Sequence, residues 1–193
     1  MIMEKCLICQ SINQKILFSD CFDLEYHRGT KYNVYQCLNC GLAYLYPTPT
    51  IEELLSFYPP EYHGYAKPLS KLTSFFINLN IRARAKFYKK LIGGKGKVLE
   101  IGAADGSQFS ILNQYENWDF LGIEFNDEIA VKGRKMGLNI ITDTLEKHNF
   151  GAMKFDLIIM NNLIEHAENP VETLKKAKEI LKPAGFIVGD TPN

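Results

Sequence analysis

Short apolar runs alternate with amphipathic stretches along the second half of the chain. The apolar runs, typical of buried strands, occupy residues 98–101, 119–123, 139–141, 155–160 and 186–188. Between them, apolar positions recur at helical spacing over residues 108–115, 127–136 and 171–181. Strands that alternate with helices predict an α/β fold with an open parallel sheet, because right-handed crossovers place the helices on both of its faces.

Residues 69–92 have the periodicity of one long helix. The apolar positions that fall on one face are Leu72, Phe76, Leu79, Ala83, Phe87 and Leu91. Most of the basic positions lie elsewhere on the helix: Lys71, Arg82, Lys86 and Lys89. We expect the apolar face to pack on the sheet. A second interpretation is that the basic face meets an anionic acceptor, such as a nucleotide-sugar or a lipid headgroup.

The first part of the chain carries two cysteine pairs. Cys6 and Cys9 form one C-x-x-C pair, and Cys37 and Cys40 form a second one 27 residues later. Residues 15–18 and 32–36 between the pairs alternate like the strands of a hairpin. Two such pairs can hold one tetrahedral zinc ion and leave no position open for a substrate, so the pattern predicts a zinc ribbon with a structural metal.

Disulfides or a redox pair are the alternative interpretations of these cysteines. A cytoplasmic chain disfavours structural disulfides, and a thioredoxin-like pair would be single and at a helix start. Cys21 is left over as a free thiol. Thr50 and Glu53 have the spacing of a capping box and predict the start of a short helix.

Composition and charge narrow the function classes. The hydrophobic content of 46% suffices for a packed core, and no apolar run is long enough to span a membrane. The N-terminus lacks the apolar segment of a signal peptide, so we expect a cytoplasmic protein. The charges sum to zero, but residues 67–97 carry nine basic groups and no acidic group. Because only one helix is basic, nucleic acid is not an expected partner.

A glycine turn follows the first strand of the α/β part. Gly102 and Gly106 let the backbone turn tightly and come close to a bound group, and the helix that follows points its free N–H groups at the same place. The spacing Gly102-x-x-x-Gly106, with Glu100 two residues before it, differs from the G-x-G-x-x-G of dinucleotide sites. Ala104 stands between the glycines, where a positive φ would be unfavourable for alanine.

Acidic and amide side chains stand at the ends of the following strands. Glu124 lies 18 residues past Gly106, one strand further along, and is placed to accept hydrogen bonds from a ribose diol. Asp143 ends the third strand and can receive an adenine amino group. Residues 161–166, Asn-Asn-Leu-Ile-Glu-His, follow the fourth strand.

These motifs resemble, in order and spacing, those of class I S-adenosylmethionine (SAM) methyltransferases, which have a Rossmann-like doubly wound sheet. The stretch Tyr35-Gln-Cys-Leu-Asn-Cys-Gly-Leu42, followed by Pro47-Thr-Pro-Thr-Ile-Glu-Glu53, is similar to zinc-ribbon methyltransferases of bacterial sugar and surface-polysaccharide pathways. The resemblance implies SAM as cofactor and a small-molecule or sugar-linked acceptor. Its implied cofactor-binding residues are Glu100, Gly102, Ala104, Asp105, Gly106, Glu124 for the ribose, Asp143 for the adenine edge, and Asn161.

The chemistry implied is in-line displacement at a sulfonium methyl group, for which the protein aligns the nucleophile and excludes water. His166 is the candidate general base. The alternative is that His166 only positions its loop or caps the following helix, and Glu165 beside it can equally be structural. Two other classes stay open: a non-catalytic zinc-ribbon or SAM-binding module and, disfavoured by the glycine spacing, a nicotinamide-dependent oxidoreductase.

The pattern divides the chain into a zinc-ribbon lobe (1–46), a linker with the basic helix (47–92) and a SAM-binding domain (93–193). Class I methyltransferases continue past the fifth strand, whereas this chain stops at Asn193. We therefore expect a truncated or shortened chain that lacks part of the acceptor site, so that its turnover is in doubt. We also expect it to associate through the exposed fifth strand.

Overall fold

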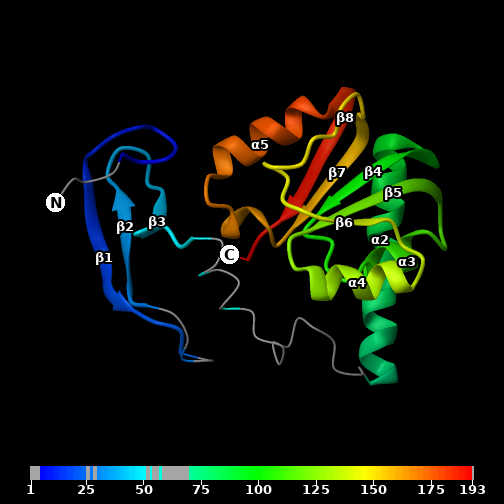
Figure 1. The fold of residues 1–193 in the computed structure, drawn as a ribbon, viewed down its shortest axis with the longest axis horizontal. Coiled ribbons are helices and arrows are strands. Elements are labelled where there is room, and N and C mark those ends of the chain that lie inside the picture. Colours follow the sequence, from blue (N-terminus) through cyan, green and yellow to red (C-terminus); the bar gives the residue numbers. More distant parts are fainter. Residues whose placement is uncertain are drawn as a thin grey trace. The chain divides into compact units, whose positions relative to one another are not determined.

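The computed structural model describes residues 5–24, 27, 30–50, 53, 57 and 70–192. The chain divides into two compact units, Met1–Tyr62 and His63–Asn193 (Figure 1). The finer division predicted above, into 1–46, 47–92 and 93–193, stays a prediction.

The first unit contains an antiparallel sheet of β1 (Gln14–Cys21), β2 (Tyr32–Cys37) and β3 (Ala43–Tyr46), in that order. Its small core centres on Tyr35, whose ring stacks on that of Tyr44 and meets that of Tyr46 edge-on. The predicted hairpin is therefore confirmed. The capping box forms as well: the Thr50 N–H donates to Glu53 Oε2 (2.8 Å) and the Glu53 N–H donates to Thr50 Oγ1 (3.2 Å).

The second unit contains a five-stranded parallel sheet in the order β6-β5-β4-β7-β8 (Figure 1). The strands are β4 (Lys95–Ile101), β5 (Asn117–Glu124), β6 (Ile140–Thr142), β7 (Phe155–Asn161) and β8 (Leu181–Asp190). The helices are α2 (Lys71–Ile92), α3 (Ser107–Leu112), α4 (Asp127–Lys135) and α5 (Pro170–Glu179), with a short 3-10 turn η1 (Ile164–His166). All five predicted strands and the predicted fold class are confirmed.

Helices cover both faces of this sheet because the side chains of its central strands alternate between two apolar clusters. On one face, Val98 and Leu157 pack with residues of α2 and α3. On the other face, Leu99 and Ile158 pack with Ala177 of α5. Within the described part, no helix is both long and apolar enough to cross a membrane.

The last strand is longer than the sequence predicts. Residues 182–185 lie between the predicted helix (171–181) and the predicted strand (186–188), but they form a bulge inside β8: Phe155 pairs with Leu181, whereas Leu157 pairs with Phe186. Asp156 anchors the bulge, because its Oδ2 accepts hydrogen bonds from Lys182 Nζ (2.7 Å) and the Lys97 N–H (2.8 Å). Among the described strands, β8 lies at the edge of the sheet, beyond β7.

Helix α2 corrects one prediction. It begins at the cap Ser70, whose Oγ accepts from the Thr73 N–H (3.1 Å). The face that it packs on the sheet carries Ile81, Ala85 and Tyr88, not the apolar positions predicted to be buried. Those positions are mostly exposed: Leu72 67%, Phe76 60%, Leu79 45% and Phe87 49%. The helix is apolar on two opposite faces, so periodicity alone selected the wrong one.

Candidate functional site

The turn after β4 places three residues in the left-handed region: Gly102 (φ +73°), Ala104 (φ +49°) and Gly106 (φ +71°). The N–H groups of Gly102 and Ala103 both donate to the carbonyl of Ile123, which holds the turn against β5. The positive φ favours glycine at position 106, and a Cβ there would lie 2.6 Å from Leu138 Cδ1, so that side chain would have to shift. The positive φ of Ala104 confirms the unfavourable backbone conformation expected at this alanine.

Glu124 holds Ala104 in this conformation. It ends β5 and is 6% exposed. Its Oε2 accepts from the Ala104 N–H and its Oε1 accepts from the Asn126 N–H, both at 2.9 Å. Burial raises the pKa of Glu124, and these backbone hydrogen bonds partly counter the rise. The carboxylate thus fixes the glycine turn, and each oxygen keeps a lone pair for a further donor.

Glu100 is the most deeply buried acid of this turn, at 5% exposed. Its Oε1 accepts a hydrogen bond from Gln108 Nε2 (3.1 Å), whereas its Oε2 has no hydrogen-bond partner among the described residues. Burial raises its pKa to about 8, although the charge of Arg84 lowers it. A buried carboxyl oxygen without a partner is costly unless a ligand supplies a donor.

A second buried atom without a partner among the described residues is Nδ2 of Asn161, at the end of β7. Asn161 and Arg84 lie beside the hydroxyl of Tyr88: burial raises the pKa of this hydroxyl, and the side chains of Arg84 and Asn161 lower it. Arg84 in turn forms an ion pair with Asp190 at the end of β8. The carboxyl ends of β4, β7 and β8 thus meet two polar side chains of α2.

The sequence-based prediction missed Arg84, Tyr88 and Asp190. Arg84 and Tyr88 are four residues apart and therefore share a helix face. Between Ile81 and Ile92, Arg84 and Tyr88 form a polar pair on one side of an otherwise apolar face, and this pair is the feature of the sequence that indicates a functional role. The opposite face carries larger apolar side chains, so periodicity favours that face instead.

Asp143 follows β6 and already has partners. Its Oδ1 accepts from the Thr144 N–H (2.8 Å), and its Oδ2 lies 3.1 Å from Nδ1 of His148. The Asp143 N–H donates to the carbonyl of Glu124, so the two acidic residues at neighbouring strand ends are linked. His148, which packs edge-on against Phe150, was not predicted.

His166 lies in η1, just after β7. Its imidazole is half-exposed, and its Nε2 is 4.0 Å from Glu165 Oε1. The loop reaches the glycine turn, because a Cβ at Gly102 would lie 3.1 Å from Leu163 Cδ1. The interpretation that His166 caps the following helix is wrong: Asn169 caps α5, and its Oδ1 accepts from Val171 and Glu172 (3.2 and 3.3 Å).

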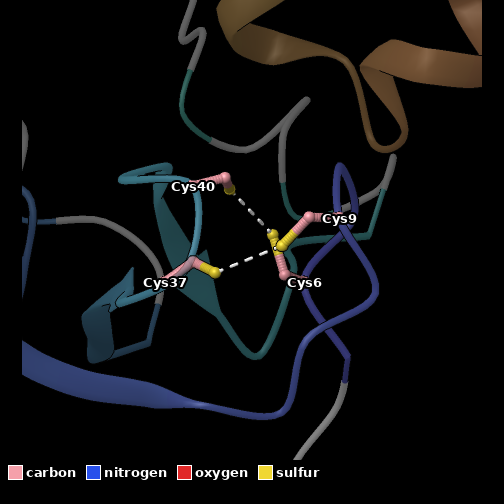
Figure 2. Close-up of side chains that lie close together, drawn as sticks. All are labelled: Cys6, Cys9, Cys37 and Cys40. Carbon is pink, nitrogen blue, oxygen red and sulfur yellow. Dashed lines mark hydrogen bonds between the residues drawn. The ribbon is translucent and has the colours of Figure 1, made fainter.

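Figure 2 shows the four predicted cysteines of the first unit pointing at one another. The Sγ atoms all lie within 4.8 Å of each other, with Cys6 to Cys40 at 3.6 Å and Cys9 to Cys37 at 3.5 Å. A zinc ion with four sulfur ligands at about 2.3 Å requires sulfur–sulfur distances of roughly 3.8 Å. The cluster therefore fits a small zinc site.

The two cysteine turns have the same backbone. Gly41 (φ +80°) donates its N–H to the carbonyl of Cys37, and Gln10 (φ +60°) donates its N–H to the carbonyl of Cys6, both at 2.9 Å. Gln10 thus has the same place in the first cysteine turn as Gly41 has in the second. The side chain of Asn39 lowers the pKa of Cys9 to about 6. A hydrogen bond from Leu42 lowers the pKa of Cys40, but burial and the neighbouring thiols raise it to about 12.

The order of the strands, the helices on both faces and the glycine turn after β4 together define the Rossmann-like fold of class I methyltransferases. Residues 73–193 match the methyltransferase-domain family, and the chain belongs to this family.

Solved structures share the fold of the second unit. A plantazolicin methyltransferase, BpumL, solved with a pentazolic desmethylPZN analog and SAH, is 21% identical, with a TM-score of 0.53 over 65% of this chain and 51% of that one. The sugar N-methyltransferase KedS8 from Streptoalloteichus sp. is 14% identical, with a TM-score of 0.51 over 66% of this chain and 56% of that one.

A relative in sequence covers a shorter part of the chain. An uncharacterized protein of Methanocaldococcus jannaschii is 32% identical over 94 residues, which are 49% of this chain and 43% of that protein. The match thus spans less than half the length of this relative.

Proposed function

We propose that this chain is a SAM-dependent methyltransferase that acts on a small-molecule or sugar-linked acceptor. The observation that carries the proposal is the pair of buried atoms without partners among the described residues, Glu100 Oε2 and Asn161 Nδ2, at the ends of the central strands β4 and β7. These atoms can accept from an ammonium group and donate to a carboxylate, the two groups at the methionine end of SAM. Family membership and the BpumL and KedS8 neighbours support the same class.

The other cofactor-binding residues keep their predicted roles as proposals. The turn from Gly102 to Gly106, with Ala104 and Asp105, would leave room for the cofactor beside the backbone. Glu124 would accept the ribose hydroxyls with its free lone pairs. Asp143 would take the adenine amino group on the oxygen that faces His148. SAM supplies an activated methyl group when bound.

The chain's own contribution to the chemistry is alignment and proton removal. The half-exposed imidazole of His166 stands on a loop packed against the glycine turn, so it can accept a proton from an acceptor hydroxyl or amine. The carboxylate of Glu165 lies 4.0 Å from Nε2 of the ring, which is beyond hydrogen-bond distance. His166 remains the proposed base.

The four cysteines are proposed to hold a structural zinc ion, because their sulfur atoms all lie within 4.8 Å of one another, close to the separations that such an ion requires. This zinc site is the feature that would group the chain with zinc-ribbon methyltransferases of bacterial sugar and surface-polysaccharide pathways. A cytoplasmic location is retained as part of the same proposal. The oxidoreductase alternative is set aside, since the chain belongs to a methyltransferase family.

Titration calorimetry with SAM and, separately, with NAD tests the cofactor. We expect the full chain to bind SAM and not NAD. Asn161→Ala should weaken SAM binding about tenfold, because it removes one hydrogen bond to a charged group. Asn139→Ala, at an exposed position just before β6, is the matched control and should bind like the unmodified protein.

Binding of NAD in preference to SAM, or no SAM binding by a folded chain that retains zinc, would contradict the proposal. SAM binding without methyl transfer to any sugar-linked or small-molecule acceptor would favour the non-catalytic module.

A further inference from the structure

Helix α2 presents large apolar side chains on the face that the core does not use. Its core face is filled by Ile81, Ala85 and Tyr88. On the opposite face lie Leu72, Phe76, Leu79 and Phe87, which we call the outer stripe, and each is 45% exposed or more. Leu72, Phe76 and Leu79 are separated by four and three residues, so they are neighbours on the helix surface. Phe75 is also exposed, at 57%.

The same helix carries only positive charges. Between Lys71 and Ile92 it contains six basic residues and no acidic one: Lys71, Arg82, Arg84, Lys86, Lys89 and Lys90. Two of the six are neutralised, Arg84 by Asp190 and Lys89 by Glu116. Lys71, Lys86 and Lys90 are exposed and form no ion pair with any residue in the described part of the chain. Unpaired cations therefore lie along and beside the outer stripe.

Charge favours one occupant for this face. A second copy of the chain, related by a two-fold axis, would bring these unpaired lysines toward one another, which is unfavourable. An anionic lipid surface satisfies both features at once: phenylalanine and leucine enter the boundary between headgroups and acyl chains, and lysines meet the negative headgroups. We propose that α2 binds the protein to the surface of an anionic membrane through the outer stripe and its flanking lysines.

Co-sedimentation of the full chain with vesicles tests this surface. We expect binding to vesicles of phosphatidylcholine with 30% phosphatidylglycerol, but little binding to phosphatidylcholine alone. Salt at 0.5 M should weaken the binding, because the electrostatic attraction is screened at that concentration. Neither vesicle experiment requires SAM or an acceptor, so this test is independent of the proposed activity.

Two matched pairs of variants locate the surface. Leu72→Gln with Phe76→Gln should weaken vesicle binding at least tenfold, whereas Met136→Gln with Leu174→Gln should leave it unchanged. Both pairs remove exposed apolar side chains, but the second pair lies on α5 and at the end of α4. Lys86→Gln with Lys90→Gln should also weaken binding about thirtyfold, since each cation near such a surface contributes about 1 kcal/mol and a factor of ten corresponds to about 1.4 kcal/mol. Lys132→Gln with Lys178→Gln, two exposed lysines outside α2, is the charge control.

Three results would overturn the proposal. The first is no binding to anionic vesicles, which is the result expected if residues 1–62 or a protein partner cover the stripe. The second is equal binding to neutral and anionic vesicles. The third is a dimer in sedimentation velocity that dissociates in the Leu72→Gln, Phe76→Gln variant.

Discussion

Ala104 is a strained residue in the glycine turn, and the strain can be measured. Its φ of +49° lies in the region that disfavours any side chain with a Cβ. Ala104→Gly should raise the free energy of unfolding by about 0.5–1 kcal/mol, since the relief of strain exceeds the entropy cost of glycine. Denaturant unfolding measures the change.

Ala184 provides the matched control, because it has a φ of +62° in the β8 bulge and is exposed. Ala184→Gly should stabilise the protein by a similar amount without changing SAM affinity, whereas Ala104→Gly is expected to change it. If Ala184→Gly stabilised the protein and Ala104→Gly did not, the strain at the turn would not be the cost that the structure indicates.

Glu100 makes stability depend on pH. Its folded-state pKa of about 8 lies above the ordinary value of 4.5. Below the ordinary value the carboxyl group is protonated in both the folded and the unfolded state, so its ionisation costs no stability. As pH rises toward 8, the unfolded state ionises first, so the free energy of unfolding falls, and it levels off above the folded-state pKa.

Glu100→Gln should remove this dependence. We expect the variant to match the unmodified protein at pH 4.5 and to exceed it by a few kcal/mol at pH 8.5, in urea unfolding. Glu128→Gln, at an exposed position on α4, should show no such difference. If Glu100 also accepts from the cofactor, the more stable variant will bind SAM more weakly. Equal SAM affinity of the variant and the unmodified protein would show that Glu100 has only a structural role.

At the scale of elements, the sequence predicted the sheet but not the orientation of α2. A run such as residues 155–160 is apolar at nearly every position, and in the fold both of its faces are buried, so the pattern and the structure agree. In α2 both faces are apolar. The choice between them depends on the shape of the sheet surface, which only the assembled strands define.

The candidate site likewise has residues that the sequence predicts and residues that it does not. The residues that the turn and strand ends contribute, such as Glu100 and Glu124, could be found from position alone, because each stands at the end of an apolar strand in the sequence. Arg84 and Asp190 meet only when α2 crosses the sheet, 106 residues apart in sequence. No local pattern contains that contact. The β8 bulge was missed for a related reason, since Asp156 holds it from the neighbouring strand.

The whole molecule consists of two units whose stabilities have different sources. The second unit buries an apolar core on both faces of a five-stranded sheet. The first unit has a three-stranded sheet that exposes Ile16 (53%) and Phe18 (63%) of β1. A core of this size is marginal by itself, so a bound metal would supply much of its folding free energy.

Zinc removal should therefore unfold the first unit and leave the second one folded. We expect the purified chain to hold about one zinc ion, as a four-cysteine site requires. A strong chelator should make amides of β1 to β3 exchange rapidly with deuterium while β4 and β7 stay protected.

Cys40→Ser should behave like the chelated protein, whereas Cys21→Ser, which changes a cysteine outside the cluster, should keep its zinc. Because zinc binds thiolates, binding at neutral pH should also release protons from the cysteines that are protonated without metal, Cys40 among them. A first unit that stays protected without metal would show that the cysteine cluster is not what holds it together.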